Sequence, residues 1–113
     1  MAFDRTLAAA TGVTPVSASG AMAADGTRTV IGLTLANILL SAITVDVYIS
    51  PDAGTTKYYL GKNVPIPSGS AFVVIGGEHK VVLKKLTASA IDDQIYVVSD
   101  TAASVDSVVS YLE

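Results

Sequence analysis

The chain has 113 residues, a formal net charge of −3 and no cysteine; half of its residues are apolar and 15% are charged. A chain of this length and composition forms one domain with one core, and without cysteine it has no disulfide, thiolate nucleophile or Cys-ligated zinc. Acidic residues outnumber basic ones, so there is no basic stripe for a phosphate backbone and we expect no nucleic-acid partner. The charged fraction is well below the roughly 25% of an average soluble domain, which indicates that something other than water covers part of the surface.

The N-terminal sequence MAFDRTLAAATG has no apolar segment of signal-peptide length, and the apolar stretches elsewhere are soon interrupted by polar residues or glycine. We therefore expect neither an export signal nor a membrane span. We assign residues 1–20 to an N-terminal arm with the first one or two short strands, able to contact a neighbour, and residues 21–113 to a β-sandwich domain. Residues 6–10 are rich in alanine but would support at most a marginal turn of helix before Gly12.

Residues 43–50 predict the clearest strand, because apolar side chains occupy every odd position from 43 to 49. This alternation is typical of a half-buried strand, with Val45 and Val47 directed into the core and Asp46 away from it. Residues 28–37 are too rich in β-branched side chains for a stable helix. We predict that they form a strand that pairs with residues 43–50.

Further strands are expected at residues 55–61, 71–75, 80–84, 94–99 and 104–112, between turn signals rich in Gly, Pro and Asp. Many short strands without intervening helices indicate an all-β fold. We predict an antiparallel β-sandwich of about eight short strands with little or no helix.

The polar residues do not form a recognisable catalytic motif. His79 is the only histidine, and no G-x-S-x-G elbow presents a nucleophile to it, so we interpret it as an ordinary polar residue at the start of a strand. Asp92, Asp93, Asp100 and Asp106 lack the spacing of a calcium loop, and we expect Asp100 to satisfy backbone donors where a loop leaves a strand. We expect no metal, no cofactor and no enzymatic activity.

The basic residues and the tyrosines each allow a binding role as well as a structural one. His79, Lys80, Lys84 and Lys85 form the only basic cluster, which we interpret as lysines that protect a sheet edge rather than as a site for bases, because no aromatic residue separates them. The five tyrosines could line a sugar-binding surface, but tyrosine is also an ordinary strand residue, and ordinary sheet packing is the favoured interpretation.

Leu39 and Leu40 lie in a connection between two predicted strands, where polar residues are usual. An apolar loop tip is either folded back on the core or buried by a neighbour. Together with Phe3 and Leu7 of the N-terminal arm, these leucines are our candidate protein-interface residues.

Four segments, RTVIGLTLAN, ITVDVYI, YYLGKNVPIPSGSAFVVIGGEHKVVL and SDTAASVDSVVSYLE, resemble small virion structural proteins of tailed bacteriophages. The resemblance covers residues 28–113. It departs at residues 84–89, where the family pattern leads us to expect a turn containing Gly or Glu before an acidic pair. The resemblance implies a β-sandwich accessory protein of the particle, such as a head decoration (cement) protein or a small head-tail component, and it carries no catalytic residues.

The resemblance and the low charge together lead to the expected function. We expect a capsid decoration protein that stabilises the head through contacts with the major capsid protein or another virion protein. It would be made in the host cytoplasm, located in the virion, and assembled as a homo-oligomer, with a trimer favoured. The alternative is a tail or neck module that recognises a protein or a glycan.

Overall fold

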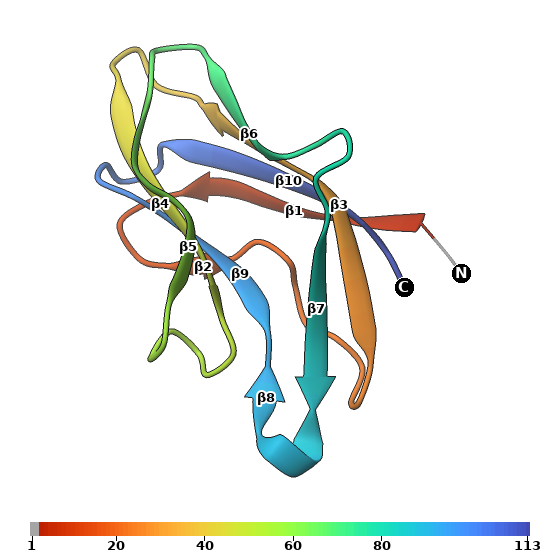
Figure 1. Ribbon diagram of the computed structural model, residues 1–113. Helices are drawn as coiled ribbons and strands as arrows, with labels where there is room; N and C mark the ends of the chain where they lie inside the picture. The colour runs from red at the N-terminus through yellow and green to blue at the C-terminus, as the bar shows by residue number, and fades with distance from the viewer. Residues whose placement is uncertain (1–2) are drawn as a thin grey trace.

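The computed structural model describes residues 3–113, which form two antiparallel β-sheets packed against each other (Figure 1). The strands of this part of the chain are β1 Phe3–Thr11, β2 Val16–Ser17, β3 Thr27–Asn37, β4 Ile43–Ser50, β5 Tyr58–Ile66, β6 Ala71–Ile75, β7 Val81–Leu86, β8 Ile91–Asp92, β9 Gln94–Ser99 and β10 Val105–Leu112. The only helical structure within residues 3–113 is one turn of 3₁₀ helix, η1, at Thr87–Ser89. The predicted all-β sandwich is confirmed.

Each of the two sheets has its own strand order. The first sheet runs β1-β10-β3, with β6 and β7 both on the far side of β3 and β8 beyond β7. β6 pairs with the second half of β3 and β7 with its first half, so β3 is the central strand of this sheet. The second sheet runs β2-β9-β4-β5. β1 and β5 are therefore edge strands of the two sheets.

The predicted pairing of residues 28–37 with residues 43–50 is wrong. β3 and β4 lie in opposite sheets, where β3 pairs with β10, β6 and β7, and β4 pairs with β5 and β9. Both strands have one strongly apolar face. Packing these faces against each other across the core removes more apolar surface from water than pairing the strands edge to edge.

Several element boundaries also differ from the prediction, including that of the strand expected at residues 80–84, which is Val81–Leu86. The strand expected at residues 55–61 starts at Tyr58 and continues to Ile66, because Asp52 holds the preceding turn by accepting hydrogen bonds from the N–H and the hydroxyl of Thr56, both at 2.7 Å. Pro65 does not end β5, since an edge strand tolerates a missing donor on its free side. Residues 6–10, considered for a marginal helical turn, belong to β1.

Apolar side chains from the two inward faces form one core. The fully buried members are Val30, Leu33, Leu35, Ile75, Leu83, Val105 and Val109 from the first sheet and Val45, Val47, Ile66, Ile95 and Val97 from the second. Val45 and Val47 point inward as predicted. Asp46 is on the other face, where its Oδ1 accepts a hydrogen bond from the N–H of Asn63 at 2.7 Å.

A β-bulge lets β3 fill this core. Val30 and Leu33 are both buried, although they are three residues apart and a regular strand would place them on opposite faces. Opposite β10, Gly32 pairs with Ser110 and Val30 with Tyr111, so Ile31 is an extra residue in β3. The bulge restores the inward direction of the following residues and leaves Ile31 outside the buried core.

Arg28 closes the core near the end of β10. Its side chain is 5% exposed, and its guanidinium carbon lies 3.8 Å from the centroid of the Tyr111 ring. Nη1 donates to the carbonyl oxygen of Ser19 at 2.6 Å, and Nε donates to Oε1 of Glu113 at 2.8 Å. A buried guanidinium is tolerable because acceptors and a ring face replace its hydration. Arg28 thus ties three separate segments together.

The opposite directions of Val47 and Asp46 predict opposite outcomes of substitution. Val47→Asp buries an unpaired carboxylate and should lower the free energy of unfolding by about 4 kcal/mol or more. Asp46→Asn keeps an oxygen that accepts the Asn63 N–H and should change it by less than about 1 kcal/mol. Chemical denaturation followed by circular dichroism measures both, and similar midpoints for the two variants would contradict the assigned faces.

Candidate functional site

The outer face of the first sheet carries a row of apolar side chains. In the strand registers, Leu7 of β1 lies opposite Val108 of β10, Val108 opposite Thr34 of β3, and Thr34 opposite Val73 of β6. Leu7, Val73 and Val108 are all exposed. A solvated face of an antiparallel sheet normally carries polar residues at these positions, so this row is a candidate interaction surface.

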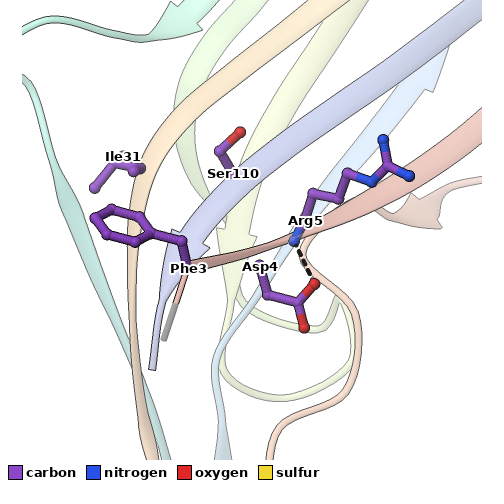
Figure 2. Close-up of a pocket in the computed structure, with 5 residues that line it drawn as sticks. All are labelled: Phe3, Asp4, Arg5, Ile31 and Ser110. Atoms are coloured by element: carbon purple, nitrogen blue, oxygen red, sulfur yellow. Dashed lines mark hydrogen bonds between the residues drawn. The ribbon is translucent and has the colours of Figure 1, made fainter. Parts of the chain in front are cut away.

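Phe3 extends this surface toward the start of β1. It lies opposite Leu112 of β10, and its side chain is 76% exposed. Figure 2 shows its ring beside Ile31, the residue that the β3 bulge leaves outside the core. We define the outer apolar face as Phe3, Leu7, Val73 and Val108.

Two shallow hollows lie on this side of the sheet. The larger, of about 490 Å³, is lined by Phe3, Asp4, Arg5, Ile31 and Ser110 (Figure 2). The second, of about 250 Å³, is lined by Leu7, Ala8, Ala9, Asp106, Ser107 and Val108. Both lie along the junction of β1 with β10.

Of the predicted interface residues, Phe3 and Leu7 belong to this face, whereas Leu39 and Leu40 lie in the connection between β3 and β4. The two leucines of this connection differ. Leu39 is partly buried and packs against the core, while Leu40 is 99% exposed. One leucine of this connection therefore contributes to the core, and the other is exposed to solvent.

The buried side chain of Asn37 fixes this connection. Its Nδ2 lies within hydrogen-bonding distance of the carbonyl oxygens of Ser41 (2.8 Å), Ile66 (3.0 Å) and Pro67 (3.2 Å), and its Oδ1 accepts the N–H of Leu39 at 2.9 Å. One amide therefore satisfies backbone groups from two loops. This arrangement holds Leu39 against the core and leaves Leu40 at the tip.

Val73 and Val108 were missed as interface candidates. The signal for Val108 was present in the sequence, because the alternation of residues 105, 107, 109 and 111 places residue 108 on the opposite face. Val73 had no comparable signal, since β6 is apolar throughout and its inward face depends on a register shift opposite β3. Only the assembled sheet shows that the two valines share a row with Leu7.

Three of the five tyrosines gather on the second sheet. Tyr48 of β4 is stacked on Tyr96 of β9, with centroids 5.5 Å apart, and makes an edge contact with Tyr59 of β5 at 5.6 Å. Lys57 lies over the ring of Tyr48 and Lys62 over that of Tyr59. Tyr48 is 2% exposed. Tyr59 is 43% exposed. The contacts among the three rings favour sheet packing over stacking on a sugar.

Burial and neighbouring groups act on the hydroxyls of this cluster. Desolvation is the main cause that raises the pKa of Tyr48, with further contributions from Tyr59, Tyr96 and Asp46. Desolvation also raises the pKa of Tyr96, assisted by the charge of Asp92. The folded protein therefore favours the neutral phenols. The remaining two tyrosines lie apart: Tyr58 is exposed, and Tyr111 packs under Arg28.

The remaining polar candidates are dispersed. His79 is exposed in the turn between β6 and β7 rather than at a strand start. Asp100 accepts the N–H of Thr44 at 3.1 Å, as expected of a residue that satisfies backbone donors, and Asp93 accepts the N–H of Lys84 at 3.1 Å. Within residues 3–113, no three His, Asp or Glu side chains are grouped as metal ligands.

Comparison with known proteins gives no family. No protein-family model matches the chain, and no curated protein matches it significantly. In the described part of the chain, no helix has the length and apolar character needed to cross a membrane.

Asn37 gives the first test of this region. Asn37→Asp replaces a donating amide by a carboxylate that faces carbonyl oxygens, and should lower the free energy of unfolding by about 2–4 kcal/mol. Ser68→Ala is the control, because it removes an exposed hydroxyl that donates to the carbonyl of Leu39 and should cost about 0.5 kcal/mol or less. Equal losses in thermal unfolding would show that Asn37 does not anchor the connection.

The tyrosine cluster predicts a loss of stability at high pH. A raised folded pKa means that the stabilisation is complete below the ordinary tyrosine pKa of 10.0 and is lost as the pH rises through the folded pKa. Tyr48→Phe should flatten the decline in melting temperature between about pH 9 and about pH 11. Tyr58→Phe, a change at an exposed ring outside the cluster, should keep the wild-type decline, and the same decline in both variants would contradict this assignment.

Proposed function

We propose that this protein is a structural component of a tailed-bacteriophage virion that decorates the capsid and stabilises it through protein contacts, without chemistry of its own. The observation that carries the proposal is the outer apolar face of the first sheet. The resemblance of residues 28–113 to small virion proteins supports the type of particle. The low charge of the chain supports a lasting contact rather than one steered by electrostatics.

The physical effect would come from buried area multiplied by copy number. Covering one exposed leucine, valine or phenylalanine contributes on the order of 1.5–3 kcal/mol before the costs of association. Phe3, Leu7, Val73 and Val108 together would form the apolar centre of a contact on the capsid, with Asp4 and Arg5 at its border. Repeated over the capsid lattice, such contacts oppose the separation of capsid subunits.

Rebinding to particles that lack the protein tests this function. Purified protein should bind them, saturate at a copy number set by capsid symmetry, and raise their resistance to heat. Leu7→Ser combined with Val108→Ser should weaken binding at least about tenfold, because each change removes apolar surface worth more than 1 kcal/mol. The circular dichroism spectrum should not change.

Val13→Ser is the matched control, because Val13 lies outside the outer apolar face and is 58% exposed, compared with 57% for Leu7. It should bind like the wild type. Leu40→Ser tests the tip of the β3–β4 connection separately, without disturbing the packed Leu39. Binding to tails or necks but not to heads would replace the decoration role by the alternative role of a tail or neck module.

A further inference from the structure

β1 has one free edge in the described part of the chain. β1 is the terminal strand of the first sheet and pairs with β10 on one side, in a regular register from Phe3 to Ala8. The N–H of Arg5 donates to Oδ1 of Asp4 at 2.8 Å (Figure 2), so it points away from β10. Backbone groups alternate between the two sides of a strand, so the N–H of Leu7 also faces the free edge. Such an edge is a template for another strand.

The other long edges carry features that oppose strand pairing. β5 has Lys62, Pro65 and a positive φ of 53° at Asn63, with two register shifts opposite β4. β7 carries Lys84 and Lys85. β2 and β8 have two residues each and β6 has five. In contrast, β1 has nine residues and neither lysine nor proline.

We propose that β1 pairs with β1 of a second copy of this chain, antiparallel and about a two-fold axis, so that two first sheets become one continuous sheet. A two-fold axis perpendicular to the sheet pairs residues of the same face, and it makes each strand its own complement. A second copy is therefore the occupant that this edge fits without any further partner. The inference concerns purified protein and does not depend on the virion assignment.

Charge and the length of the regular part of β1, Phe3 to Ala8, together select the register. An axis at Arg5 would place two guanidinium groups opposite each other, and an axis at Asp4 would do the same with two carboxylates, which is unfavourable. An axis at Thr6 avoids both, because it places Arg5 opposite Leu7 of the other copy within the regular part of β1. The N–H and carbonyl groups of Arg5 in one copy then form hydrogen bonds with those of Leu7 in the other copy, and the two-fold axis repeats this pair of bonds. The N–H of Arg5 becomes available when it leaves Oδ1 of Asp4.

This pairing doubles the outer apolar face. Leu7 of both copies would lie beside the axis, and the row from Leu7 to Val73 would continue into its counterpart. The assembly is a dimer, in place of the trimer expected from composition, because edge pairing about a two-fold axis closes with two copies.

Light scattering on purified protein tests the dimer. Wild type and Arg5→Ala, which keeps the backbone donor, should have the mass of two chains at high micromolar concentration. Arg5→Pro removes the donor on the free side only and should weaken dimerisation at least about tenfold, since two symmetric hydrogen bonds are lost. A monomeric wild type, a trimer, or an Arg5→Pro variant that dimerises like the wild type would overturn the proposal.

Cysteine cross-linking keeps the test decisive if Arg5→Pro fails to fold. The chain has no cysteine, so Thr6→Cys introduces one thiol at the proposed axis, and mild oxidation should convert most of the folded protein into a disulfide-linked dimer. Val13→Cys, at an exposed position outside β1, should cross-link far more slowly. Equal rates for the two variants would overturn the β1 pairing, whatever the outcome of particle binding.

Discussion

The bulge at Ile31 is the constraint on which the core and the candidate surface both depend. β3 is the central strand of the first sheet, and its buried residues must face the second sheet along its whole length. Val30 and Leu33 meet this condition only because Ile31 is an extra residue opposite β10. The same irregularity leaves Ile31 on the side of the sheet where Phe3 lies. One local distortion therefore completes the interior and helps to shape the exterior.

Buried polar side chains fix both ends of β3. Near the start, Arg28 contacts Ser19, Tyr111 and Glu113, and at the end Asn37 satisfies backbone groups from the loops on both sides of it. Such groups would destabilise the core if they lacked partners, but their partners are present and distributed over distant segments. They specify where the chain enters the first sheet and where it crosses to the second.

The outer faces of the two sheets differ in how they are covered. On the second sheet, tyrosines pack against one another across three strands, and lysine side chains lie over two of the rings. These contacts bury the ring of Tyr48, while Tyr59 remains 43% exposed. On the first sheet, Leu7, Val73 and Val108 have no such cover and remain exposed. The asymmetry supports an interaction through the first sheet and a stabilising role for the tyrosines.

The sequence by itself determined the fold class and the direction of Val45 and Val47, because alternation and turn residues are local properties of a strand. It did not determine which strands are neighbours, since pairing depends on contacts far apart in the chain, and the expected pairing of residues 28–37 with residues 43–50 was wrong. The separate positions of Leu39 and Leu40 were likewise decided by the tertiary structure, through the amide of Asn37. The row that joins Leu7 to two valines exists only because β1, β10, β3 and β6 lie side by side, and no local pattern encodes that order.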